Sequence, residues 1–243
     1  ERKNKWIIFL NQSVELCQFL YSFIKRFLFP YKPYNDIIFI WGMHMNNNVI
    51  KFSTYRKDDK MCKTLEKIHG KTPDELLMEY GVYDTIPIDL ESLVKSIGIS
   101  VLPMNFTKLE KRLKRNDILG LVLTSGNDAA IFYRETDGIN RIRFTIAHEL
   151  AHCCNIDPNN NEPHIEYRLD EKDKDADEKK MDIFAGELLI PFHKLKEEYM
   201  KMSLPNSVDL AKRFQVSVSV MEARLDYLRI SYYSENMEPI FYG

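Results

Sequence analysis

Cysteine is scarce in this chain of 243 residues, which has only four. Cys17, Cys62, Cys153 and Cys154 form neither a Cys-x-x-Cys spacing nor a disulfide framework, and the adjacent Cys153 and Cys154 could not readily pair with each other. The cysteine pattern therefore argues against a disulfide-stapled secreted fold. It predicts a reducing, cytoplasmic location.

Long hydrophobic runs are also missing. Residues 6–29 come nearest, because they are rich in aromatic and aliphatic side chains and follow a basic start, but several polar residues interrupt them. No uninterrupted run approaches the ~20 apolar residues that a membrane-spanning helix needs. We therefore expect no membrane association unless residues 6–29 form an amphipathic helix that contacts a membrane or a partner protein.

Excess charge of either sign is absent, since the formal net charge is −2. This argues against broad electrostatic binding of nucleic acid, although it leaves a local basic patch possible. With 44% hydrophobic and 29% charged residues, the composition is that of an ordinary globular protein, long enough for one substantial domain and an appendage.

One stretch carries recognisable chemistry: Arg-Phe-Thr-Ile-Ala-His-Glu-Leu-Ala-His, residues 143–152. Side chains four residues apart share a helix face, so His148 and His152 can direct ring nitrogens at one point that suits Zn²⁺. Glu149 lies about 100° further round the helix, where it is a poor ligand but a natural general base. The alternative is a pair of hydrogen-bonded, inert histidines on a half-buried helix.

A catalytic zinc site needs a third protein ligand. Residues 181–191 predict an amphipathic helix ended by Pro191, with Ile183, Phe184, Leu188 and Leu189 on its buried side. Glu178 and Asp182 lie one turn apart at its start, so Glu178 could bind the metal while Asp182 orients a histidine. Asp177, His164 and His193 are the other candidates for the third ligand. The rest of the charge run, residues 170–177, predicts a solvated surface.

These residues resemble the ImmA/IrrE-type metallopeptidases, a gluzincin-like family. Residues 143–152 are similar to the family's RFTxAHExxH core, residues 178–191 to its ExxANxFAAxLLMP helix, and residues 86–101 to its opening helix and strand. The departures are mild: Met181, Asp182 and Gly186 replace alanine, asparagine and alanine, and Cys153-Cys154 is unusual. None of them removes a group that the chemistry needs.

The resemblance implies that His148, His152 and Glu178 bind Zn²⁺ and that Glu149 is the catalytic base. It implies an α+β, zincin-like fold, in which a small sheet packs on the HExxH helix. It also implies a zinc endopeptidase with a specific protein substrate, typically a helix-turn-helix repressor. Two rivals remain: a DNA-binding regulator with a vestigial zinc site, and a toxin/antitoxin-type module whose pocket is occupied by its partner.

The peptidase domain is expected to span residues 46–192. Thr72 and Asp89 are predicted to cap helices over residues 73–80 and 90–97, and residues 99–102 to form a strand. Strands over residues 118–124 and 129–133 flank a turn, and this hairpin could supply the edge strand to which a peptide substrate adds. The equally compatible alternative is that the hairpin simply covers the core.

The two ends of the chain differ from this domain. Residues 193–243 predict a helix-turn-helix-like segment, with a first helix over residues 210–214 and a second capped by Ser217. Glu222 and Asp226 make the second helix a poor surface for phosphates, so packing or substrate docking is favoured over DNA binding. Residues 1–45 predict a hydrophobic extension, to which the sequence assigns no role. Met43 or Met45 would make a plausible start of the functional protein.

Overall fold

The computed structural model describes residues 37–38, 55–56, 64–114, 116–125, 127–159, 164–169 and 175–242. The chain divides into two units, Glu1–Cys62 and Lys63–Gly243. In the first unit, β1 (Ile37–Ile38) pairs antiparallel with β2 (Tyr55–Arg56). The helix considered at residues 6–29 and the start at Met43 or Met45 concern residues outside the described ranges. The domain boundaries drawn from the sequence stay a prediction.

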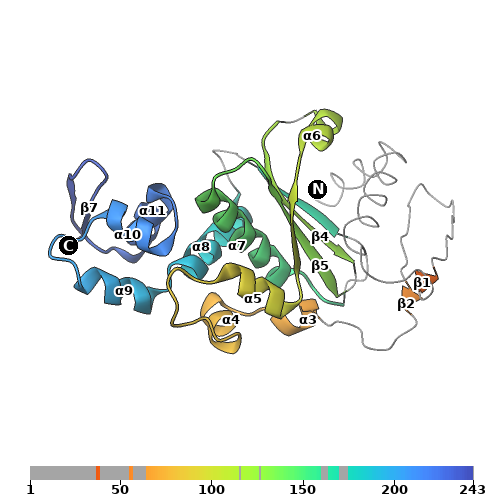
Figure 1. Ribbon diagram of the computed structural model, residues 1–243, viewed down its shortest axis with the longest axis horizontal. Helices are drawn as coiled ribbons and strands as arrows, with labels where there is room; N and C mark the ends of the chain where they lie inside the picture. The colour runs from red at the N-terminus through yellow and green to blue at the C-terminus, as the bar shows by residue number, and fades with distance from the viewer. Residues whose placement is uncertain are drawn as a thin grey trace. The chain divides into compact units, whose positions relative to one another are not determined.

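The second unit is built on a four-stranded mixed sheet in the order β3-β5-β4-β6 (Figure 1). As the turn composition predicts, β4 (Ile118–Ser125) and β5 (Asp128–Arg134) form an antiparallel hairpin. The strand β3 (Ser100–Met104) runs parallel to β5, and β6 (His164–Leu169) runs antiparallel to β4. Both hairpin strands are therefore central, and the expectation that the hairpin supplies a free edge for substrate is wrong, because β3 and β6 cover its two sides.

The strand β6 was not among the elements predicted from the sequence. It begins at His164, after a stretch of polar residues. Ile165, Tyr167 and Leu169 alternate with charged residues at positions 166 and 168, which is the period-two pattern of a half-buried strand, but the pattern spans only five residues.

The helices that precede and cover the sheet follow their capping signals. In α4 (Pro73–Glu79), Thr72 and Glu75 form a capping box, and in α5 (Leu90–Ile97) the Asp89 carboxylate accepts from the Ser92 amide, as expected. Gly98 ends α5 at φ 97°, a left-handed conformation that favours glycine. The short helices α3 (Thr64–Ile68) and α6 (Thr107–Leu113) carried no clear sequence signal.

The HExxH motif lies on α7 (Ile139–Asn155), which packs against β4 and β5 (Figure 1). The strand registers place Val122, Ile131 and Glu166 in one cross-strand row, so these side chains share the face of the sheet that α7 covers. Ala147 and Leu150 of α7 are fully buried in the same core as Val122 and Ile131. The α+β class, with a small sheet packed on the HExxH helix, is thus confirmed.

The second motif lies on α8 (Ala176–Leu189), where the Asp175 side chain caps the first turn by accepting from the amides of Asp177 and Glu178. The helix is longer than the predicted amphipathic segment and lies alongside α7. Leu188 and Leu189 are buried as expected, but Ile183 is 39% exposed. Its placement on the buried face was wrong, because α8 leaves an open space beside it.

The C-terminal helices form a group to the left of α7 and α8 in Figure 1. These are α9 (Phe192–Met200), α10 (Ser207–Phe214) and α11 (Val218–Leu228), followed by the hairpin of β7 (Tyr232–Tyr233) and β8 (Pro239–Ile240). The turn between α10 and α11 is tied to α7, since Asn140 donates to the carbonyl of Val216 and Arg143 to that of Gln215. The two helices and the Ser217 cap match the sequence prediction, whereas a DNA-binding role for them stays untested.

Membrane insertion was also considered from the sequence. Within the described ranges, no helix is both long and apolar enough to cross a bilayer.

Candidate metal centre

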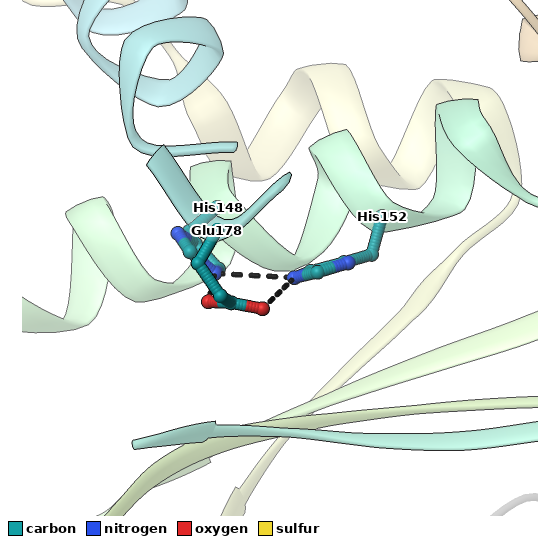
Figure 2. Close-up of side chains that lie close together, drawn as sticks. All are labelled: His148, His152 and Glu178. Carbon is teal, nitrogen blue, oxygen red and sulfur yellow. Dashed lines mark hydrogen bonds and ion pairs between the residues drawn. The ribbon is translucent and has the colours of Figure 1, made fainter. Parts of the chain in front are cut away.

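The residues predicted to bind a metal come together where α7 and α8 face each other (Figure 2). The Nε2 atoms of His148 and His152 are 3.2 Å apart. The Glu178 carboxylate lies across from both rings, with Oε2 3.2 Å from His148 Nε2 and Oε1 3.5 Å from His152 Nε2. The ligand atoms of all three residues lie within 4.8 Å of one another, so this group could hold a metal ion.

The outer nitrogen of each ring is held by a carboxylate. His148 Nδ1 lies 2.9 Å from Asp182 Oδ1, and His152 Nδ1 lies 3.0 Å from Glu166 Oε2. A carboxylate only accepts, so each Nδ1 donates its proton and each neutral ring keeps its lone pair on Nε2. The two lone pairs then face each other at 3.2 Å, an arrangement that needs a cation or a shared proton between them.

The spacing of the two ring nitrogens is compatible with a shared metal ion. Ligands at about 2.0–2.1 Å from a tetrahedral Zn²⁺ lie about 3.3 Å from one another. The two Nε2 atoms are 3.2 Å apart, and one oxygen of Glu178 lies 3.2 Å from His148 Nε2 while the other lies 3.5 Å from His152 Nε2. Two imidazoles and a carboxylate are also the donor set of many catalytic zinc sites, which leave the fourth position open. The residues therefore fit a divalent metal ion.

Glu149 is the buried charge beside this group. Its side chain is 0% exposed, and neither carboxylate oxygen has a hydrogen-bond partner among the described residues. Burial raises the pKa of Glu149 to about 7, against the opposing effects of His148, His152 and Arg168. A buried carboxylate without partners is costly, so the fold keeps a proton acceptor there at a free-energy cost.

Charge also sets the behaviour of His152. Burial opposes its protonation, but the hydrogen bond and charge of Glu166, together with Glu149 and Glu178, raise the pKa of His152 above its ordinary value. The carboxylates around His152 thus favour a positive charge beside this ring.

Sequence reasoning missed the two side chains that β6 contributes. Glu166 holds His152, and Arg168, only 7% exposed, donates from Nη1 to Thr145 Oγ1 at 2.9 Å. Arg168 Nη2 is 4.0 Å from Asp182 Oδ1, and its guanidinium lies 4.8 Å from the centre of the Phe144 ring. The alternation of residues 165–169 could have revealed the strand, and with it that residues 166 and 168 point the same way.

Gly120 gives these side chains their space. It pairs with Arg168 across the β4–β6 ladder, and a Cβ placed on it would lie 2.4 Å from Thr145 Cγ2 and 2.8 Å from Glu149 Oε1. Any side chain at this position would collide with α7 at the point where it carries Glu149. The glycine is therefore needed for close approach of strand and helix.

The alternative third ligands lie elsewhere or are not described. His193 stacks on Tyr83 with ring centroids 3.8 Å apart and bonds the Tyr83 carbonyl, and Asp177 pairs with Lys180 on the surface. The backbone of His164 opens β6, but its side chain lies outside the described part of the structure. Among the described residues, the metal-binding group consists of His148, His152 and Glu178, and the role of each stays a prediction.

The chain was compared with known proteins. The family model Peptidase M78, described as the IrrE N-terminal-like domain, matches residues 94–226. This match covers more than half of the chain and includes α7, α8, α10 and all strands of the four-stranded sheet. No curated protein matches the chain.

Proposed function

We propose that this chain, which belongs to the peptidase M78 family of IrrE N-terminal-like domains, is a zinc-dependent endopeptidase that cuts a specific protein substrate. The observation that carries the proposal is the convergence of His148, His152 and Glu178 within 4.8 Å, beside a buried Glu149 that has no hydrogen-bond partner among the described residues. An inert histidine pair needs neither the third carboxylate nor the unsatisfied one.

In this proposal His148, His152 and Glu178 hold the metal, and Asp182 and Glu166 orient the two imidazoles. Zn²⁺ bound there would polarise the scissile carbonyl and lower the pKa of water towards ~7. Glu149 takes a proton from the attacking water on a carboxylate oxygen and passes it to the amide nitrogen of the leaving group. The buried position of Glu149 beside the metal-binding residues suits this exchange, because a base must lie within reach of the proton that it takes.

The substrate would reach the site along β6. Among the described strands it is an edge of the sheet, and its Glu166 and Arg168 side chains contact the residues of the site. An extended peptide can add to such an edge through main-chain hydrogen bonds, as it does in other edge-strand complexes. Strand addition at β6 replaces the hairpin edge that the sequence had suggested.

The substrate class we propose is a helix-turn-helix transcriptional repressor. Its support is the resemblance of residues 143–152 and 178–191 to the ImmA/IrrE-type enzymes. A DNA-binding role for the chain itself is less favoured, because α11 packs on α8. The arginine of α11, Arg224, is only 7% exposed. It donates to Glu187 and to the Ile190 carbonyl instead of facing outward.

The test compares two substrates. The zinc-loaded chain is incubated with unfolded casein and with helix-turn-helix repressors encoded near its gene, and the products are identified by mass spectrometry. We expect one or a few cuts in one repressor and little cleavage of casein. Rapid cutting of casein at many sites, with no preference for a repressor, would instead indicate a general processing peptidase.

A further inference from the structure

The metal-binding residues occupy only part of the contact between α7 and α8. The facing residues of these helices, which we call the α7–α8 seam, follow each other one turn apart: His152, His148 and Phe144 on α7, and Glu178, Asp182 and Gly186 on α8. His152 meets Glu178, and His148 meets Asp182. At the third turn, Gly186 offers no side chain to Phe144.

A cavity lies beside the seam at this third turn. Its volume is about 340 Å³, and Phe144, Ile183 and Gly186 line it together with residues of α11. A Cβ built on Gly186 would meet nothing within 4 Å, so the glycine opens onto empty space. Ile183 is 39% exposed and Tyr227 is 57% exposed at its wall, which leaves apolar surface uncovered next to the metal-binding group.

The lining of the cavity is mainly apolar, with Asp182 and Ser219 as further polar members beside Arg224. Val220 and Ala223 of α11 add aliphatic walls, and the cationic lining residue is already neutralised, since Arg224 donates to Glu187 and to the Ile190 carbonyl. An acidic group would therefore find no free cation among the lining residues. A volume at the lower end of the range for ligand sites suits one large side chain better than a whole cofactor.

The cavity lies next to the proposed path of a substrate along β6. Asp182 lines the cavity and holds His148, and Arg168 of β6 stacks over Phe144 at the cavity edge. A peptide on the β6 edge that passes Glu166 at His152 therefore passes Arg168 at Phe144 next. Phe144 lies six residues along α7 from the midpoint of the two histidines, about 9 Å at 1.5 Å per residue. That distance corresponds to about two or three residues of an extended peptide.

We propose that this cavity is a specificity pocket that binds a large apolar side chain of the substrate, two or three residues from the scissile bond. The proposal rests on the proposed peptidase function and adds the residue type that this site selects. Gly186 is the key position, because a side chain there would occupy the pocket without touching the metal-binding residues.

Two pocket-filling variants test the proposal, Gly186→Leu from α8 and Ala223→Leu from α11. The control is Lys180→Leu, which places the same leucine side chain on α8 at a lysine whose side chain is 69% exposed. Cleavage sites in a library of proteome-derived peptides are mapped by mass spectrometry. We expect the wild-type chain and Lys180→Leu to prefer leucine or phenylalanine over alanine at the predicted position. In the pocket-filling variants, the ratio of cleavage with leucine or phenylalanine to cleavage with alanine at this position should fall by at least about tenfold.

A measurement of peptide binding tests the pocket even if no peptide is cut. Fluorescent octapeptides of alanine and serine, each with a single leucine at a different position, are titrated onto the zinc-loaded Glu149→Gln variant with and without Gly186→Leu. We expect leucine at one position to tighten the Kd and Gly186→Leu to remove the gain. Equal Kd values for all peptides, or a preference that survives both pocket-filling variants, would overturn the pocket. Cleavage that persists in Glu149→Gln or with a chelator would instead overturn the proposed function and leave the binding result standing.

Discussion

Buried charges in the C-terminal helices and around the metal-binding residues are satisfied to different degrees. In the C-terminal helices, Glu198 is 6% exposed and forms ion pairs with both Lys201 and Arg213. Beside the metal-binding residues, neither oxygen of the fully buried Glu149 has a hydrogen-bond partner in the described part of the chain, and two imidazole nitrogens face each other. A charge that the fold satisfies by itself serves stability, whereas one left unsatisfied is kept for a ligand or a reaction.

The comparison predicts its largest effect for Glu149→Gln. The amide keeps the size of the side chain but cannot accept a proton, so peptide hydrolysis should fall by about 10²- to 10⁴-fold. Zinc content, measured by elemental analysis, should stay at the wild-type level. Cleavage of a genuine substrate at the wild-type rate would remove Glu149 from the mechanism.

The same residue should give the metal-free protein an unusual response to pH. Burial raises the pKa of Glu149 from 4.5 to about 7, so the folded state favours the protonated form. The contribution of the protonated Glu149 to the free energy of unfolding is fully present below pH 4.5. It is lost as the pH rises through 7, a change of about 3 kcal/mol. Urea unfolding of the chelator-treated chain should show this fall, and Glu149→Gln should flatten it.

Glu198 provides the opposite case. Its hydrogen bond from Lys201 outweighs burial, and with Arg213 it lowers the pKa of Glu198 below 4.5. The stability that Glu198 contributes is therefore present above pH 4.5 and is lost as the pH falls. In Glu198→Gln the free energy of unfolding should be lower above pH 4.5 and should fall less on acidification, while zinc content stays unchanged. If both variants altered the profile in the same direction, the distinction between the two regions would fail.

Asp182→Asn tests the support of a single histidine. The amide oxygen can still accept from His148 Nδ1 but carries no charge, so it supports this ring more weakly and metal affinity should fall by about 10-fold, the lower end of the range for such partners. Asp177→Asn is the matched control on the same helix, since Asp177 pairs with Lys180 at the surface. Competition with a chromogenic chelator gives both affinities, and equal values would show that Asp182 plays no part in holding the metal.

The smallest effects come from two glycines. Gly120→Ala places a Cβ 2.4 Å from the stiff Thr145 side chain, so it should destabilise the fold by about 1–3 kcal/mol. Gly186→Ala meets nothing within 4 Å and should stabilise α8 by about 0.5–1 kcal/mol, since alanine is the better helix former. Denaturant unfolding measures both, and a destabilising Gly186→Ala would mean that the space beside α8 is filled.

Local signals explain what the sequence could predict. The HExxH spacing, the caps at Thr72, Asp89 and Ser217, and the hairpin turn depend on nearby residues, and the structure has each of them. The approach of Glu178 to the histidines was predicted because Glu178 and Asp182 lie one turn apart on a helix. That reasoning needed no knowledge of the tertiary fold.

Long-range packing explains what it could not. The role of Gly120 depends on a strand meeting a helix 25 residues later, and nothing around position 120 indicates this contact. Ile183 was placed in the core because its periodicity is apolar, but the open turn at Gly186 leaves it at a cavity wall. The strand β6 was missed because its alternating pattern is short and lies between a polar stretch and a charge run.

The central claim is that His148, His152 and Glu178 hold one zinc ion, and metal analysis of the purified chain tests it most directly. We expect one zinc per wild-type chain, loss of the metal in His148→Ala, and a clear drop in affinity in Glu178→Gln. Full occupancy and affinity in Glu178→Gln would show that the third ligand is another residue. A wild-type chain that binds no zinc at micromolar concentration would contradict the account as a whole.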